Sequence, residues 1–268
     1  MRLSWRLTFL RGIILISRGG RMKIVHFKKR KDGMVKFVLE NGEEILAHED
    51  LILKYELLRS KEVDTKQLEQ IQQENETYQL YTVALNYLKI KMRSKKEIAT
   101  YLKQKQVDAK KIEQVLEILN RQGYLQESIY ADAFVHDRMV LSMDGPLKIA
   151  DELRKNEIND EEIERALACF NEELEQEKVQ NYIQKQLRIN KRKSSTRLKQ
   201  KLKMDLERLG YHASIYQYEL SKIEVDDTNL YQEEYQKLFQ KLSKKYQGKE
   251  LEWRIKQKLY QKGFRKEE

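Results

Sequence analysis

The sequence predicts a mainly α-helical protein in which tandem three-helix repeats form an elongated helical array, preceded by a small three-stranded antiparallel β module. The 268 residues are 36% charged and include 10 glycines and a single proline, a composition typical of long solvated helices. A triplet of apolar residues recurs four times at nearly constant spacing, which indicates a repeat architecture. Only the segment before residue 48 shows the period of two that favours strands.

The first 21 residues resemble a secretory leader only superficially. Arg11 interrupts the apolar run after Arg6, whereas a signal needs about 7 to 15 uninterrupted apolar residues and a cleavage site, and a membrane span needs about 20. An Arg-Gly-Gly-Arg run directly precedes Met22, as a ribosome-binding sequence translated in frame would. We therefore expect Met22 to be the native start, with residues 1–21 a non-native or disordered extension. A genuine N-terminal arm is the alternative. We expect a cytoplasmic protein.

The segment from residue 23 to residue 47 alternates apolar and polar residues and predicts three short strands. The pairs Asp32-Gly33 and Asn41-Gly42 separate these strands, because both favour the positive φ angles of tight hairpins. Three short strands bury too little apolar surface alone, so we expect a helix beginning near His48 to lie against them. The polar segment 62–76 is predicted to be a helix that joins this β module to the rest of the chain.

An apolar triplet then recurs along the remaining chain. Its second residue follows the first by four positions, and its third follows the second by five. The four copies are Ile98, Leu102 and Val107; Ile149, Leu153 and Ile158; Leu202, Leu206 and Tyr211; and Ile255, Leu259 and Phe264. The central leucines are 51, 53 and 53 residues apart. Such self-similarity in a charged sequence predicts a helical array.

The triplet spacing predicts how each leading helix ends. The first two positions are one helical turn apart and share a buried face. Gly210 and Gly263 stand directly before the third position in the last two copies. A left-handed glycine ends a helix in the Schellman motif, in which the following apolar residue folds back onto the last turn. Ser94 with Glu97 predicts a capping box at the start of the first leading helix.

Two further apolar-periodic segments follow each of the first three triplets, so each unit is predicted to be a three-helix bundle. The expected domains are the β module with its helices at 22–76 and the repeat region at 77–268, with repeats at about 92–143, 144–194 and 195–247 and a partial repeat at 248–268. The partial repeat is expected to cap the array. It is rich in lysine and glutamate and offers no long apolar seam, so we expect a monomer.

Side chains that could support catalysis or metal binding are not grouped in the sequence. Cys169 is the one cysteine and lies at helical spacing among apolar residues, so we expect a core residue and neither a disulfide nor a cysteine metal site. The four histidines are scattered singly, and no phosphate-binding glycine loop or nucleophile elbow is present. We predict no catalytic residue, no metal and no cofactor, and no enzymatic activity.

The charge distribution gives the strongest binding signal. Net charge is +10 at pH 7. Residues 184–204 carry nine basic residues and no acidic one, whereas residues 151–177 carry eleven acidic residues against three basic ones. Such adjacent opposite fields suit a protein that contacts both a polyanion and a protein surface. A merely solvated face is the alternative. Most tyrosines stand at core spacing, so we interpret them as packing residues and not as base-stacking ones.

The candidate residues for binding nucleic acid or a protein partner come from two segments. The first segment contributes Lys91, Arg93, Lys95 and Lys96. The second contributes the nine basic residues of 184–204, called here the basic cluster: Lys185, Arg188, Lys191, Arg192, Lys193, Arg197, Lys199, Lys201 and Lys203.

Several motifs resemble the RecX family of regulators. The run Tyr87-Leu88-Lys89-Ile90-Lys91-Met92-Arg93-Ser94, followed by Glu97-Ile98 and Tyr101-Leu102, is similar to the signature in which an Arg-Ser pair opens a helix. Gly123-Tyr124-Leu125 with Tyr130-Ala131 and Phe134-Val135 resembles the second segment, and Gly145 with 149–153 the next repeat. A leading β module and a partial fourth repeat resemble the long variant from low-GC Gram-positive bacteria. The resemblance covers roughly residues 22–264.

The resemblance implies a function in recombination, DNA repair and the SOS response. RecX-like proteins lie in the groove of the RecA filament on single-stranded DNA, depress its ATPase and strand exchange, and favour its disassembly. The implied partners are therefore the RecA filament and single-stranded DNA, with double-stranded DNA as a further ligand and no membrane. Two alternatives stay open on the residues alone. One is a DNA-binding repeat regulator without RecA specificity, and the other is an enzyme acting on nucleic acid.

Overall fold

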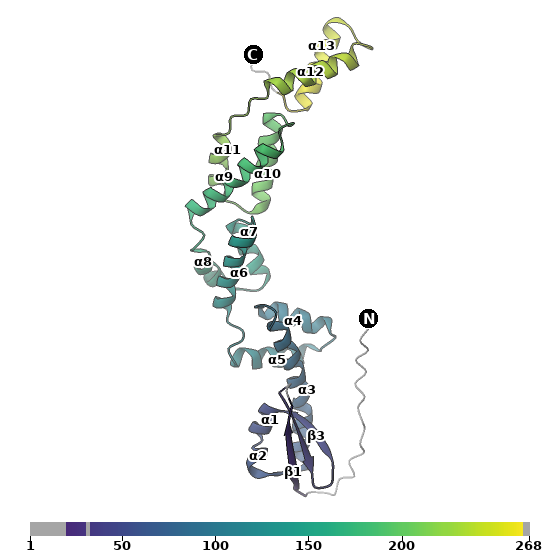
Figure 1. The fold of residues 1–268 in the computed structure, drawn as a ribbon, viewed down its shortest axis with the longest axis vertical. Coiled ribbons are helices and arrows are strands. Elements are labelled where there is room, and N and C mark those ends of the chain that lie inside the picture. The colour runs from purple at the N-terminus through teal and green to yellow at the C-terminus, as the bar shows by residue number, and fades with distance from the viewer. Residues whose placement is uncertain (1–19, 31–32, 265–268) are drawn as a thin grey trace. The chain divides into compact units, whose positions relative to one another are not determined.

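The structure is a computed structural model that describes residues 20–30 and 33–264 (Figure 1). The expectations for residues 1–21 therefore lie outside the described residues, apart from Gly20 and Arg21. The described residues form thirteen helices and four strands, which confirms a mainly α chain of tandem helices behind a small antiparallel β module. The chain divides into two compact units, one comprising residues up to Lys91 with Ile98–Tyr124, the other Met92–Glu97 with Leu125 onward. None of the described helices is both long and apolar enough to cross a membrane.

The antiparallel sheet has the order β3-β2-β1-β4. Its strands are β1 (Met22–Lys29), β2 (Met34–Leu39), β3 (Glu44–His48) and β4 (Glu62–Val63). Gly33 and Gly42 take positive φ angles of 78° and 82° in the two turns, as the turn pairs predict. The expectation of three strands is wrong by one. Val63, expected within a helix, pairs with Met22 and is fully buried, so this β-branched residue adds a fourth short strand before the helix begins.

Three helices lie against the sheet (Figure 1). They are α1 (Glu49–Lys54), α2 (Leu57–Ser60) and α3 (Thr65–Leu88), and the greater part of α4 (Lys95–Gln104) with α5 (Ala109–Arg121) completes the first unit. Phe37, Leu51 and Ile71 are fully buried between the sheet and these helices. The joining helix starts at Thr65 and not at 62 because Asp64 forms a reciprocal capping box with Gln67.

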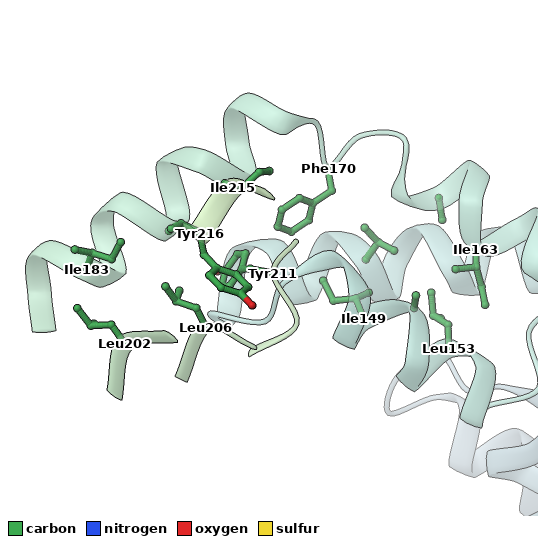
Figure 2. Close-up of a cluster of buried hydrophobic side chains, with 14 of the residues drawn as sticks. Ile149, Leu153, Ile163, Phe170, Ile183, Leu202, Leu206, Tyr211, Ile215 and Tyr216 are labelled. Carbon is green, nitrogen blue, oxygen red and sulfur yellow. The ribbon is translucent and has the colours of Figure 1, made fainter. Parts of the chain in front are cut away.

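The second unit contains the remaining helices, which pack around more than one apolar cluster. The helices are α6 (Glu127–Leu141), α7 (Pro146–Lys155), α8 (Asp160–Leu167), α9 (Glu172–Ile189), α10 (Ser195–Leu209), α11 (Ala213–Ser221), α12 (Thr228–Leu242) and α13 (Gly248–Gln261). Figure 2 shows Tyr211 among Ile149, Leu206 and Tyr216 in a cluster that joins the second and third repeats. A separate cluster around Ile255 packs α13 on α12.

All four leading helices, α4, α7, α10 and α13, end in the way the triplets predict. In each copy the amide of the third apolar residue donates to the carbonyl of the central leucine, the six-residue bond of the Schellman motif. The pairs are Val107 to Leu102 at 3.3 Å, Ile158 to Leu153 at 3.2 Å, Tyr211 to Leu206 at 3.2 Å, and Phe264 to Leu259 at 3.1 Å. The preceding residue is left-handed in every copy, with φ of 63° at Gln106, 62° at Glu157, 81° at Gly210 and 84° at Gly263. Two copies therefore hold a non-glycine residue in a conformation that favours glycine.

Within the second unit, the start of one leading helix contacts the end of the next. The Gly145 amide donates to the Leu209 carbonyl at 2.7 Å, and the Leu147 amide donates to the Gly210 carbonyl at 3.0 Å. At the following junction, Ser194 Oγ donates to the Lys262 carbonyl at 2.7 Å. Helix starts carry free amides and helix ends carry free carbonyls, and their partial charges attract. The ends of successive leading helices are thus joined by hydrogen bonds, from backbone amides at the first junction and from the Ser194 hydroxyl at the second.

Cys169 differs from its sequence expectation. It was expected in the core, yet it is exposed. The helix that sets the apolar spacing, α8, ends at Leu167, and Phe170 takes the buried position after the turn. The apolar period therefore stops two residues before the cysteine, whose Sγ lies 3.6 Å from the Met139 sulfur.

Candidate nucleic-acid interface

The basic cluster begins on the exposed face of α9. Asn181, Gln184, Lys185, Arg188 and Ile189 line a surface hollow of about 480 Å³. Their spacing of three and four residues places them on one face of the helix. Lys185 and Arg188 are both exposed, so two cations border this hollow together with the exposed Ile189.

A tight turn carries the next three cations. Lys191, Arg192 and Lys193 are all exposed between the end of α9 and the start of α10. The Lys193 amide donates to the Asn190 carbonyl at 3.1 Å, and Asn190 Nδ2 donates to the Gln186 carbonyl at 2.9 Å. These bonds fix the backbone of the turn, so three long cationic side chains are held close together without a fixed position for any one head group.

Two members of the basic cluster already have protein partners. Lys201 Nζ lies 2.5 Å from an Asp205 oxygen, and Arg197 Nη2 donates to the Gln261 carbonyl at 2.5 Å. Burial alone would raise the pKa of Asp205, but hydrogen bonds from Lys201 and Tyr182 bring that pKa below its ordinary value. The Tyr182 pKa rises to about 12 through burial and its bond to Asp205. Lys201 and Arg197 therefore stabilise the bundle, and they are poorly placed to bind a phosphate.

The other seven members form no salt bridge with any described residue. They are Lys185, Arg188, Lys191, Arg192, Lys193, Lys199 and Lys203. Unpaired cations concentrated within one stretch repel one another. Binding a polyanion would relieve that repulsion and release counterions.

Most of the candidate cations near α4 already form ion pairs with carboxylates of the protein. Arg93 lies 3.1 Å from Glu97, with 15% of its side chain exposed. Lys95 pairs with Glu127 at 2.8 Å, and Lys96 pairs with Glu157 at 3.0 Å. Lys91 is exposed. Three of these four cations would have to leave a carboxylate before contacting a phosphate, so the basic cluster is the better candidate.

Glu97 organises the motif that opens α4. The Ser94 amide donates to Glu97 Oε2 at 3.0 Å while the Glu97 amide donates to Ser94 Oγ at 3.1 Å, which confirms the capping box. The Tyr130 hydroxyl also donates to Glu97, at 3.0 Å. Burial raises the pKa of Tyr130, and the Glu97 charge raises it further. Within the second unit, Glu97 therefore holds the Arg-Ser motif against Tyr130 of α6.

Acidic groups lie on the helices before the basic cluster. Asp151 and Asp160 share Arg154 at 3.2 and 2.8 Å, and the buried Glu175 bonds the His212 amide and ring. Others are exposed and form no ion pair with a described residue: Glu161, Glu164, Glu172, Glu173 and Glu177. The second unit thus presents free carboxylates on α8 and early α9 and free cations from late α9 onward.

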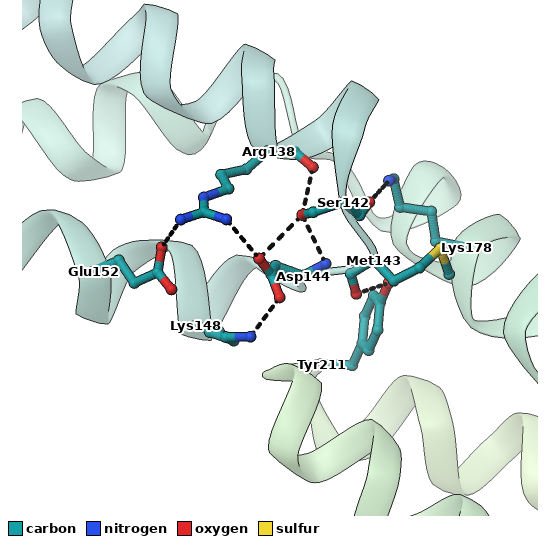
Figure 3. Close-up of polar contacts among 8 residues, drawn as sticks. All are labelled: Arg138, Ser142, Met143, Asp144, Lys148, Glu152, Lys178 and Tyr211. Carbon is teal, nitrogen blue, oxygen red and sulfur yellow. Dashed lines mark hydrogen bonds and ion pairs between the residues drawn. The ribbon is translucent and has the colours of Figure 1, made fainter.

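A polar junction between α6 and α7 escapes sequence reasoning (Figure 3). Asp144 accepts from Lys148 at 2.5 Å and from Ser142 at 3.0 Å. Burial opposes ionisation, but these bonds leave the Asp144 pKa below its ordinary value.

Two residues from later helices complete this junction. Lys178 from α9 donates to the Met139 carbonyl at 2.6 Å, and burial lowers the Lys178 pKa. Tyr211 completes the junction by donating to the Met143 carbonyl at 2.9 Å. The Tyr211 and Met143 pair is 68 positions apart in the sequence, so no local pattern reveals the junction.

Comparisons with known proteins agree with the fold. The family model described as RecX, first three-helix domain, matches residues 81–119, and that of the second three-helix domain matches residues 127–167. Regulatory protein RecX of Halalkalibacterium halodurans is 33% identical over 238 residues, covering 85% of this chain and 89% of the relative. The Bacillus subtilis protein of the same name is 30% identical, covering 80% and 83%. A crystal structure of a regulatory protein RecX superposes with a TM-score of 0.64 at 26% identity, covering 73% of this chain and 97% of the other. By sequence and by fold, the chain belongs to the RecX family of regulatory proteins.

Proposed function

We propose that this protein regulates RecA without catalysing a reaction, by binding the RecA filament on DNA and lowering its ATPase activity, strand exchange and persistence. Membership of a family of regulatory proteins supports the regulatory part of this proposal. The RecA specificity rests on the resemblance between the Arg93-Ser94 and Tyr130 motifs and those of RecX proteins. The proposed setting is the cytoplasm, where recombination and repair of DNA take place.

The observation that carries the proposal is the set of seven unpaired cations on α9, its following turn and α10. A DNA backbone carries one negative charge per phosphate, and neutralising it with lysine and arginine releases counterions. The free carboxylates of α8 and early α9 cannot contribute to that contact. They are available for a protein surface of the filament, which matches the two opposite fields of the second unit.

The tandem repeats support filament binding in particular. A filament offers the same protomer surface many times, and a chain of similar three-helix units can contact several copies. Linked weak contacts raise the overall affinity well above that of each contact alone. No single repeat then needs a deep pocket or a large apolar patch.

We propose binding and not catalysis because three carboxylates in the core of the second unit are held as anions. Asp144, Asp205 and Glu219 all have lowered pKa values despite burial, because lysines and other donors hydrogen-bond to them. A general acid or base functions best with a pKa near the working pH. These three groups are therefore suited to structural ion pairs.

A steady-state assay of RecA ATPase on single-stranded DNA tests this function. Adding the protein should lower the rate in proportion to its occupancy of the filament. If the protein binds DNA without RecA specificity, inhibition should disappear when single-stranded DNA is in such excess that RecA and this protein bind different strands. Inhibition that persists at saturating DNA supports a direct RecA contact, whereas an unchanged ATPase rate at full binding to DNA would overturn RecA regulation.

We also propose a monomer, because the exposed residues of α12 and α13 are dominated by lysine, glutamate and glutamine. Light scattering at micromolar concentration should give a mass near 32.3 kDa for the 268-residue chain. A stable dimer at that concentration would contradict it.

A further inference from the structure

The outward face of α13 carries two lysines that alternate with two aromatic residues. The residues are Lys249, Trp253, Lys256 and Tyr260, called here the α13 stripe. Their spacing of four, three and four residues places all of them on one face of a helix. The opposite face carries Leu251, Ile255 and Leu259, which are buried against α12.

Both aromatic rings of the α13 stripe are largely exposed. Trp253 exposes 59% of its surface and Tyr260 exposes 68%. Neither ring belongs to the apolar cluster that packs α13 on α12, so the fold does not use them. This corrects the expectation that the tyrosines are packing residues, at least for Tyr260. An exposed tryptophan beside an exposed tyrosine points to a ligand with flat, apolar faces.

We propose that the α13 stripe binds single-stranded nucleic acid, with bases stacked on Trp253 and Tyr260 and phosphates near Lys249 and Lys256. Every base has a π-face, so alternating rings and cations form a platform that tolerates any sequence. The two rings are seven residues apart, about 10 Å along the helix axis. Stacked bases are about 3.4 Å apart on one strand, so the two rings can engage nucleotides that are close neighbours.

The pattern favours a nucleic acid over a protein partner or a second copy of the chain. Protein interfaces are marked by contiguous apolar patches, whereas lysine stands beside each ring of the α13 stripe. Neither Lys249 nor Lys256 forms a salt bridge with any described residue, and the nearby Glu250 is occupied by Arg254 at 3.1 Å. Glu252 is exposed within one turn of both lysines, but it forms no ion pair with either among the described residues. The stripe therefore presents two lysines without an ion-pair partner, which suits a phosphate backbone.

This site differs from the basic cluster in its chemistry, and it does not depend on RecA binding. The basic cluster contains no aromatic residue, so it can bind phosphates without stacking on bases. The α13 stripe adds base contacts on the partial fourth repeat. A strand bound there would be held in an unpaired state, because its bases face the rings.

Intrinsic fluorescence provides a direct readout. The chain has two tryptophans, Trp5 and Trp253, so the variant Trp5→Phe retains Trp253 as its single tryptophan. Titration with an oligothymidylate should quench its emission, because stacking brings a base onto the indole. An oligonucleotide of equal length without bases should bind through charge and leave the emission nearly unchanged. An oligouridylate arm distinguishes DNA from RNA as the preferred strand.

Affinity measurements on substituted chains complete the test. Trp253→Ala and Tyr260→Ala should each weaken oligothymidylate binding by about 5-fold to 140-fold, which corresponds to the loss of about one stacked base. The matched control is Tyr218→Ala, because Tyr218 is 57% exposed on α11, outside the stripe. The affinity of Tyr218→Ala for oligothymidylate should stay within about twofold of that of the parent protein. Circular dichroism should show all three variants folded, since exposed side chains contribute little to stability.

The outcomes separate this proposal from the proposed function. Quenching that persists when Lys191, Arg192 and Lys193 are changed to glutamine supports the α13 stripe even if the basic cluster proves irrelevant. Oligothymidylate binding without quenching, or binding unaffected by Trp253→Ala, would overturn the stripe while leaving RecA regulation intact. Emission that changes with protein concentration alone would instead assign the face to self-association, which also overturns the proposal.

Discussion

Gly145 and Gly210 face each other so closely that neither has room for a side chain. A β-carbon on Gly145 would lie 2.5 Å from the Gly210 carbonyl oxygen, and one on Gly210 would lie 2.4 Å from the Lys148 amide nitrogen. Both neighbouring atoms belong to backbone, which cannot rotate away. The two glycines therefore allow the start of α7 to hydrogen-bond with the end of α10.

Substituting Gly210 should destabilise the protein beyond the usual cost of a strained turn. Gly210→Ala combines a positive φ with a backbone clash, whereas Gly42→Ala has nearly the same φ of 82° and open space around it. Forcing a methyl group into a packed site costs about 1–3 kcal/mol, so we expect Gly210→Ala to lower the free energy of unfolding by that much more than Gly42→Ala. Urea denaturation measures both. Equal losses would mean that the two helix ends can separate freely.

Replacing Gln106 with glycine should stabilise the chain. Gln106 is held at a φ of 63°, which costs a non-glycine residue about 1–2 kcal/mol. Glycine also gains unfolded-state entropy, which offsets about 0.4–1 kcal/mol of this benefit. The expected net gain in the free energy of unfolding is about 0.5–1 kcal/mol. Lys103→Gly, inside α4, is the control and should lose about 1 kcal/mol. A loss in both variants would refute the strain at Gln106.

Removing three cations from the turn after α9 should flatten the salt dependence of DNA binding. Changing Lys191, Arg192 and Lys193 to glutamine should reduce the slope of log affinity against log salt by roughly 2, since each lost contact to a single strand contributes about 0.7. Arg197 is left intact because it bonds α13. Titrations at several salt concentrations give the slope.

A control of equal charge comes from the first unit. Lys66, Lys103 and Lys110 are exposed there, and changing them to glutamine removes the same net charge without touching the basic cluster. If this control flattens the slope as much as the turn variant does, the effect comes from net charge and not from a contact at the cluster. Unfolding free energies should stay within about 0.5 kcal/mol for both variants.

The Asp144 junction should make stability sensitive to acid. The folded-state pKa of Asp144 is lowered by Lys148 and Ser142 against the opposing effect of burial. A lowered folded pKa means that the stabilisation is complete above the unfolded pKa and disappears as the pH falls through the folded pKa. Asp144→Asn should therefore lower the melting temperature near about pH 7, and the difference from the parent protein should shrink as the pH falls towards the lowered folded pKa of Asp144. Thermal scans at a series of pH values from about 7 downward show whether the melting temperatures of Asp144→Asn and the parent protein converge. A constant difference at every pH would show that the Asp144 charge is not involved.

The repeat register and the helix ends could be predicted from the sequence because they depend on local spacing. Leu206 and Tyr211 are five residues apart, and their backbone bond follows from one helical turn and one left-handed residue. The turns at Gly33 and Gly42 are local in the same sense. The strand at Val63 was missed because its partner, Met22, lies far away in the sequence and the pair adds only two residues to the sheet.

The candidate site was predictable in position but not in composition. The run of basic residues locates the basic cluster in the sequence. Only the tertiary structure shows that Lys201 forms an ion pair with Asp205 and that Arg197 donates a hydrogen bond to the Gln261 carbonyl. Exposure follows the position within the triplet. Tyr211 and Phe264 hold the third position of their triplets and are both buried, whereas Tyr260 directly follows the central leucine Leu259 and is 68% exposed.

The contact between successive leading helices gives the array a direction of growth. Backbone amides at the start of α7 donate to carbonyls at the end of α10. The Ser194 hydroxyl at the start of α10 donates to the Lys262 carbonyl at the end of α13. The start of α13 has no side-chain cap among the described residues, so it is the position at which a further leading helix could add its own carbonyl end. Gene duplication or loss of whole repeats at this end would alter only one junction. Relatives of different length can therefore arise without redesign of the β module or of the first repeats.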